Sequence, residues 1–127
     1  MDLLRRRPLH LLSAGRGAAG VAMLARPALL PRALGVDSTT ASRLTWMTRM
    51  VGARELAVGA GTLLALRRGR HVEEWALAAL LCDGVDAAAF GTAVAKGDVR
   101  QVPGAVLVLT AASGVALAAM ALRDLRG

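Results

Sequence analysis

Four long apolar stretches alternate with short polar segments along this chain of 127 residues. The stretches cover residues 9–25, 46–66, 75–95 and 103–122. Each is close to the roughly 20 residues that an α-helix needs to cross about 30 Å of hydrocarbon. The last stretch contains no charged residue, although a helix on a soluble bundle needs a polar stripe. The pattern therefore predicts an all-α fold, a four-helix transmembrane bundle with short loops.

The polar segments contain the signals that end helices. Residues 26–45 contain two prolines, one glycine and a cluster of small polar side chains, which predicts a proline-bearing loop or short interfacial segment after the first helix. The basic cluster at 67–71 predicts a tight polar turn, and the Lys-Gly-Asp sequence at 96–98 predicts a stop. Trp46 and Trp75 each begin a stretch, where interfacial aromatic side chains belong.

Composition agrees with a membrane protein. The chain is 55% hydrophobic and 20% charged, and its aromatic residues are two tryptophans and one phenylalanine. Its length predicts one integral membrane domain, residues 1–127. A soluble core would have few large side chains to bury, whereas helix packing through small residues suits a bilayer. A soluble, alanine-rich four-helix bundle is the alternative, and the uncharged fourth stretch argues against it.

The net charge of +7 does not predict nucleic-acid binding, because the basic residues gather at the ends of the apolar stretches. Anionic lipid head groups explain them more simply. One side of the predicted bundle has eight basic residues and the other has five. The excess predicts that both termini are cytoplasmic. The eight are Arg5, Arg6, Arg7, Arg67, Arg68, Arg70, Arg123 and Arg126, and the five are Arg26, Arg32, Arg43, Lys96 and Arg100.

The arginines at 5–7 before an apolar stretch also fit the start of a secretory signal. Arg16 interrupts that stretch, however, and no good small-x-small cleavage site stands out after Ala25. We therefore interpret residues 9–25 as a retained first span.

Five ionisable residues lie inside the predicted spans: Arg16, Arg54, Glu55, Asp83 and Asp86. A charge near the bilayer centre costs roughly 2.5 to 3.5 kcal/mol, so it rarely persists without a partner or a function. At about 1.5 Å per residue, Arg54, Glu55 and Asp86 lie at a similar depth of about 17 Å, and Arg16 can meet Asp83. The residues predict one buried polar cluster. Its carboxylates outnumber its guanidinium groups by one, so either a carboxylate is protonated or Arg49 completes the balance.

The cluster has three interpretations. It forms a site for a small molecule or lipid, in a binding protein or an accessory subunit, or it serves a proton-coupled carrier for a small solute. Alternatively, it is an ion-pair network that only fixes the helices of a structural membrane subunit. An unequal set of carboxylates favours a site.

No catalytic motif is recognisable, and we expect no enzymatic activity, cofactor or metal. The Gly-x-Gly-x-x-Gly pattern at 15–20 has no preceding strand, so it does not predict a nucleotide site. His10 and His71 lack a second ligand cluster. Cys82 lies beside a carboxylate inside the third span, which is typical of a packing residue and not of a reactive thiol.

Small residues recur every four positions on two predicted helices. These faces predict close packing within the bundle, and homodimerisation is the alternative. They consist of Ala53, Ala57 and Gly61 on the second helix, and of Gly84, Ala88 and Thr92 on the third.

Several pieces of the sequence carry a family resemblance, which covers essentially the whole chain, including the proline-bearing segment. The sequence Gly-Ala-Arg-Glu-Leu-Ala-Val-Gly at 52–59, a basic turn, a Trp-led third stretch and Asp-Gly-Val-Asp at 83–86 resemble small four-span bacterial membrane proteins of unknown function. Those proteins are similar to the DoxX-like superfamily. The resemblance implies a four-helix bundle in the bacterial inner (plasma) membrane, with the lipid bilayer and a membrane protein or a second copy as partners.

Some DoxX-like members are associated with quinone-linked sulfur oxidation or with complexes that handle redox stress. This chain has a single cysteine and few aromatic residues. It also has no pair of haem ligands in its sequence. The resemblance therefore implies the fold more strongly than the chemistry.

Overall fold

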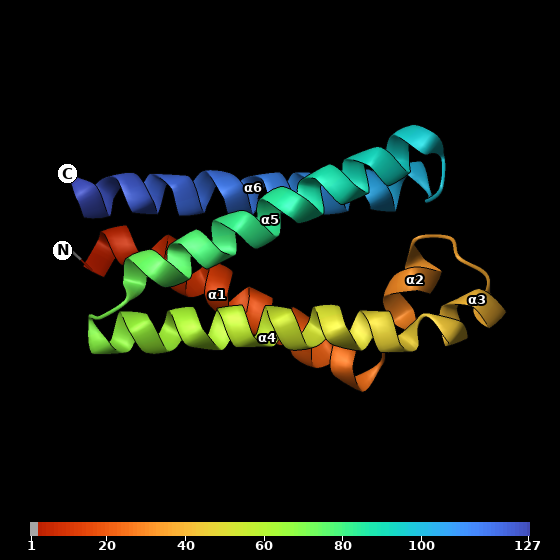
Figure 1. The fold of residues 1–127 in the computed structure, drawn as a ribbon, viewed down its shortest axis with the longest axis horizontal. Helices are drawn as coiled ribbons and strands as arrows, with labels where there is room; N and C mark the ends of the chain where they lie inside the picture. The colour runs from red at the N-terminus through yellow and green to blue at the C-terminus, as the bar shows by residue number, and fades with distance from the viewer. Residues whose placement is uncertain (1–2) are drawn as a thin grey trace.

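The computed structural model describes residues 3–127 and consists of helices, with no strand in that range (Figure 1). The all-α prediction is confirmed. Side chains are described from Arg7 onward, so Arg5 and Arg6 of the predicted cytoplasmic cluster lie outside the described side chains. The helices are α1 (Leu3–Ala25), α2 (Leu29–Ala33), α3 (Ser38–Arg43), α4 (Thr45–Arg68), α5 (Val72–Lys96) and α6 (Gln101–Arg126).

The four long helices α1, α4, α5 and α6 coincide with the four apolar stretches. They have 23 to 26 residues, or about 35 to 39 Å at 1.5 Å per residue. The predicted turn and stop are confirmed: Gly69 caps the end of α4 and Gly97 caps the end of α5, with φ of 63° and 75°. Glycine adopts this left-handed conformation without the steric cost of a Cβ atom.

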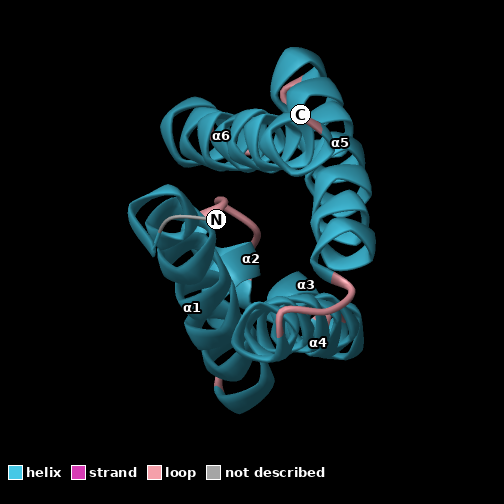
Figure 2. Cartoon of the chain, turned by 90° about the vertical axis from the view of Figure 1, so that its left-hand side faces the viewer, coloured by secondary structure: helices cyan, strands magenta, loops and turns pink. Residues whose placement is uncertain are grey.

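The helix α1 packs closely along α4 because glycines remove side chains from the contact (Figure 2). A Cβ atom on Gly20 would lie 2.6 Å from the carbonyl oxygen of Gly52. A Cβ atom on Gly59 would lie 2.7 Å from the carbonyl oxygen of Ser13. The two backbones therefore touch directly, and a larger residue at either position must push the helices apart.

The small-residue faces predicted to pack within the bundle are mostly exposed, so that prediction was wrong. Ala53, Ala57, Gly84, Ala88 and Thr92 lie on the surface. On α4 the positions that face α1 are Gly52 and Gly59, on a different side of the helix. Only Gly61 of the predicted set makes a close contact, against the indole ring of Trp75. The spacing indicated helix faces made of small residues, but it did not indicate which of these faces packs against another helix.

The helices α5 and α6 form the second close pair, and the two pairs touch each other much less (Figure 2). They meet through an apolar cluster of Leu9, Ala65, Leu66 and Val72, with Trp75, Ala121 and Leu125 packed against it. This cluster includes residues from all four long helices. It lies near the start of α1, the end of α6 and the α4–α5 turn, which share one end of the molecule (Figure 1).

The segment predicted as a loop or interfacial piece contains the short helices α2 and α3. Asp37 caps α3, because its carboxylate accepts a hydrogen bond from the Thr40 N–H at 3.0 Å. Hydrogen bonding from the side chain of Thr40, together with that from its backbone N–H, lowers the pKa of Asp37 below its usual value. The Arg100 N–H donates to the carbonyl oxygen of Leu34 at 2.9 Å. The segment is thus tied to the α5–α6 turn, at the end opposite the termini (Figure 1).

Many large apolar side chains lie on the outer surface of the described chain. Large exposed side chains occur on all four long helices, among them Leu11, Met50, Leu81 and Leu109. Within the described residues, α5 and α6 are long and apolar enough to cross a membrane, and the apolar windows in them are only 11% and 22% buried. Charged Arg16 and Asp83 are buried instead. This is the reverse of the usual soluble arrangement.

Candidate ligand-binding site

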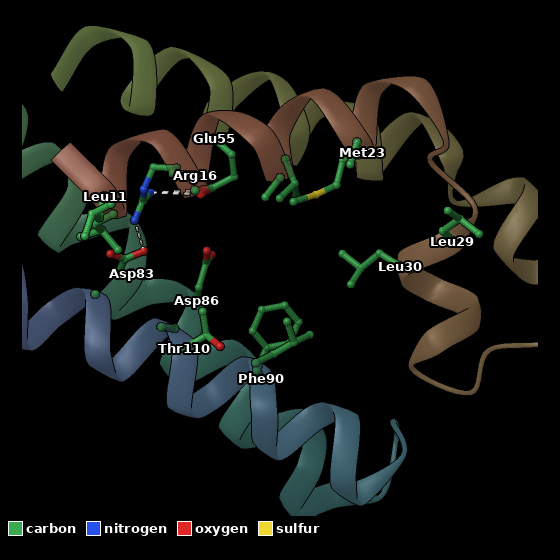
Figure 3. A pocket seen from close by; sticks show the side chains of 18 of the residues that line it. Leu11, Arg16, Met23, Leu29, Leu30, Glu55, Asp83, Asp86, Phe90 and Thr110 are labelled. Atoms are coloured by element: carbon green, nitrogen blue, oxygen red, sulfur yellow. Dashed lines mark hydrogen bonds and ion pairs between the residues drawn. The ribbon is translucent and has the colours of Figure 1, made fainter. Parts of the chain in front are cut away.

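The structure joins the five charged residues into one chain of alternating sign. Arg16 contacts Asp83 through Nη2, and its Nη1 lies 3.2 Å from Oε2 of Glu55 (Figure 3). Glu55 in turn accepts a hydrogen bond from Arg54, whose Nη2 lies 3.1 Å from Oε1 of Glu55. The same Nη2 lies 2.6 Å from Oδ2 of Asp86. The order is therefore Asp83, Arg16, Glu55, Arg54, Asp86, across α1, α4 and α5.

The two ends of this chain differ in burial. The side chains of Arg16 and Asp83 are 6% and 8% exposed. Those of Arg54 and Asp86 are 32% and 23% exposed. The Arg16–Asp83 contact therefore lies in the interior, where loss of one partner would leave an uncompensated charge.

A glycine on α6 makes room for the buried carboxylate. A Cβ atom on Gly114 would overlap Oδ2 of Asp83. That same oxygen is buried and has no hydrogen-bond partner among the described residues. Buried polar atoms in proteins are nearly always paired, so the cluster is incomplete at this end.

The charges of the cluster do not balance. Both guanidinium groups bridge two carboxylates each, and a carboxylate ends the chain on either side. Arg49, the residue expected to complete the balance, lies on the surface. None of the ion pairs between described side chains includes it. The formal excess is one negative charge, and it remains inside the bundle.

A cavity of about 660 Å³ lies beside the cluster. Arg16, Glu55, Asp83 and Asp86 form one part of its wall. Most of the remaining wall is apolar, and Met23, Leu30 and Phe90 surround the space beyond the carboxylates (Figure 3). The cavity occupies the region where the two helix pairs make few contacts. Volume and lining are those of a site for a drug-sized molecule with one polar end.

The cavity opens to the surface along one face of α1. The residues of that face are Leu11, Gly15, Ala19, Ala22 and Arg26, spaced three or four apart, and all are exposed as well as lining the cavity. A Cβ atom on Gly15 would meet nothing within 4 Å. The opening is therefore a long slot bordered by small residues, on the side of the molecule whose surface is apolar.

Sequence reasoning missed the apolar half of this site. Leu29 and Leu30 come from the proline-bearing segment, and α2 turns them toward the cavity (Figure 3). Phe90 lies one helical turn beyond Asp86 on α5. The i, i+4 spacing of Asp86 and Phe90 could have indicated that both side chains lie on the same face of α5. The sequence contained no such signal for the position of α2, because that position depends on contacts with the distant α5–α6 turn.

The weaker motifs form no site. Residues 15–20 lie in the interior of α1, where backbone N–H groups are occupied by the helix and cannot bind phosphate. The His71 ring lies 3.1 Å from Glu74 on the surface. Within the part of the chain that is described, no group of three or more metal-binding side chains comes together. Cys82 is partly buried on α5.

No protein-family model, curated protein or solved structure matches this chain. Inference about function therefore depends on the geometry of the cluster and its cavity. The resemblance to DoxX-like proteins stays a prediction from the sequence.

Proposed function

We propose that this protein is a four-span integral membrane bundle that binds a small molecule or lipid in the cavity between its helix pairs. One observation carries the proposal: an apolar cavity of about 660 Å³ ends at four charged side chains from three helices. Ion pairs that served only to hold helices together would not need such a space beside them. The protein acts as a binding protein or as an accessory subunit of a membrane complex.

The exposed surface supports four spans. The apolar helices α5 and α6 are joined by α1 and α4, which are 23 and 24 residues long. The central charges of α1 and α4 pair with carboxylates inside the bundle, and this pairing reduces the cost of placing them in lipid. Met50 and Val21 on their outer faces are 65% and 53% exposed, as lipid-facing side chains would be.

Location and family are part of the same proposal. The basic residues favour cytoplasmic termini in a bacterial inner membrane. The residues that carry the DoxX-like resemblance, Arg54, Glu55, Asp83 and Asp86, are also those that form the cluster.

The test is native mass spectrometry of detergent-extracted protein, with a matched pair of double variants. Arg54→Met with Asp86→Asn removes one charge of each sign from the cluster. Arg49→Met with Asp98→Asn does the same at exposed positions outside it. We expect a bound species in the wild type and in the exposed-site variant, and its loss from a folded cluster variant. A folded wild type that carries nothing and takes up no lipid or quinone would count against the proposal.

A proton-coupled carrier is the second candidate function. The observation that favours it is the buried Oδ2 of Asp83, which has no partner among the described residues, so that binding of a proton there would remove the excess negative charge of the cluster. Reconstituted vesicles with an imposed pH gradient would then take up solute, and Asp83→Asn would abolish the uptake. Equal flux with and without the gradient would exclude coupling and leave the binding role.

A further inference from the structure

The charge at the polar end of the cavity selects the class of ligand. We propose that the cavity takes a lipophilic cation, such as a protonated long-chain amine, with its positive group against Asp86. This inference depends on the proposed binding function and makes it more specific. It follows from charge balance, from the position of the carboxylate oxygens and from the shape of the opening.

Five charged side chains line the cavity within the described part of the chain. Arg16 comes from α1, Arg26 directly follows α1, Glu55 comes from α4, and Asp83 and Asp86 come from α5. Arg54 of α4 borders the cluster through Glu55 and Asp86. The described side chains of α6 that line the cavity carry no charge. Both cluster arginines are already shared between two carboxylates, so an added anion would meet an excess of negative charge.

One carboxylate oxygen remains for a ligand. Arg54 contacts Oδ2 of Asp86, and the Asp86 side chain points into the cavity and is 23% exposed, so its Oδ1 is the oxygen that a ligand can reach (Figure 3). The Asp83 side chain is 8% exposed and its unpaired Oδ2 is buried against Gly114, so Asp83 contributes negative charge but no direct contact. A cation at Asp86 would bring the charge of the cluster to zero. It would also make charge-assisted hydrogen bonds in a site with little water, where they are strongest.

The only other lining charge, Arg26, fixes the direction of the ligand. It lies ten residues after Arg16, just beyond the end of α1, or about 15 Å along the helix direction, and it also lines the cavity. A cationic group is therefore repelled from Arg26 and attracted to the carboxylates. The apolar part of the ligand then lies between Met23, Leu30 and Phe90, which line the cavity as well.

The slot along α1 indicates the route of entry. Its small residues Gly15, Ala19 and Ala22 border an opening on the apolar outer surface. A molecule that partitions into the bilayer reaches this opening without leaving the lipid. Amphiphilic amines partition in this way, whereas strongly hydrated cations do not.

The experiment compares three probes that share one tail: decylamine, decanol and decanoate, which carry +1, 0 and −1 at pH 7. Binding is measured by titration calorimetry on the full chain in nanodiscs of zwitterionic lipid, with empty nanodiscs as the blank. We expect decylamine to bind about tenfold more tightly than decanol, since close charge pairs of this kind couple by at least that factor, and decanoate to bind most weakly. Decanol or decanoate binding as tightly as decylamine would overturn the inference but leave the binding function intact.

Two pairs of variants locate the site. Asp86→Asn should bind decylamine about tenfold more weakly, close to decanol, whereas Asp98→Asn removes the same charge from an exposed turn and should leave binding unchanged. Gly15→Leu fills the slot from a position with open space around it and should abolish binding of every probe. Gly84→Leu, also in open space but outside the cavity, should not.

These variants and probes distinguish two claims, that the cavity binds a ligand and that the ligand is a cation. If Asp86→Asn does not fold, the Gly15→Leu and Gly84→Leu pair still decides whether the cavity is the site. Decylamine binding that survives Gly15→Leu would place the cation elsewhere and overturn the inference. Failure of all three probes to bind the folded wild type would count against the binding function itself.

Discussion

The contact within the first helix pair and the contact between the two pairs are built in opposite ways. Helices α1 and α4 touch backbone to backbone at Gly20, Gly52 and Gly59, with no space left between them. The two pairs face each other across ion pairs and a cavity of about 660 Å³. The first contact has the density of a structural core, whereas the second keeps charge and empty volume. A bundle that needed only stability would not retain the second kind of contact.

The largest expected effect is on the contact between the pairs. Arg16→Met leaves Asp83 and part of Glu55 without a cation in the interior, and we expect a loss of about 3 to 5 kcal/mol in the free energy of unfolding. Unfolding in mixed detergent micelles measures the loss. The exposed Arg49→Met is the control and should change little.

A paired replacement sharpens this result. Arg16→Met combined with Asp83→Leu removes both charges, so most of the lost stability should return, because an apolar pair of similar volume is often no worse than a buried ion pair. A double variant as unstable as Arg16→Met alone would show that the instability does not come from the unpaired carboxylate.

The glycine contact comes next. Gly59→Leu inserts a side chain against the backbone of Ser13 and Gly17, and we expect a loss of about 1 to 3 kcal/mol as α1 and α4 move apart. Protease sensitivity of the α1–α4 segment should rise together with the loss measured in micelles. Gly84→Leu, which has open space around it, is the matched control. Equal stability of the two variants would contradict a backbone contact in this pair.

A smaller effect is expected at the exposed end of the charged chain. Arg54 is about a third exposed, and water can partly solvate Asp86 when Arg54 is removed. Arg54→Met should therefore lower the free energy of unfolding by about 1 kcal/mol, which is well below the loss expected for Arg16→Met. The same unfolding measurement compares the two. A loss as large as that of Arg16→Met would mean that water solvates the Asp86 carboxylate less than the exposed fraction of its side chain indicates.

The smallest effect lies outside both contacts. Asp37 caps α3, and its pKa is lowered by the hydrogen bond from Thr40, so its contribution to stability is present above the unfolded pKa near 3.8. That contribution is lost as the pH falls through the lower folded value. The melting temperature of Asp37→Ala should lie slightly below that of the wild type at neutral pH, and the difference should disappear in acid. A difference in melting temperature that persists in acid would mean that Asp37 stabilises α3 without the charge of its carboxylate.

The sequence by itself determined the helices and the members of the cluster. Apolar stretches of nearly spanning length define α1, α4, α5 and α6, and glycines in positive-φ positions end α4 and α5. Charges are so costly in an apolar stretch that Arg16, Arg54, Glu55, Asp83 and Asp86 were expected to meet. These features depend on local composition and helix periodicity, which a single sequence contains.

Only the tertiary structure decided which faces meet and where the space lies. The exposed small faces on α4 and α5 have the same spacing as faces that pack, so spacing alone misassigned them. The order of the ion pairs, the surface position of Arg49 and the fold-back of α2 all depend on how distant segments are placed. A cavity is the volume that packed helices fail to fill, and no local pattern of residues records it.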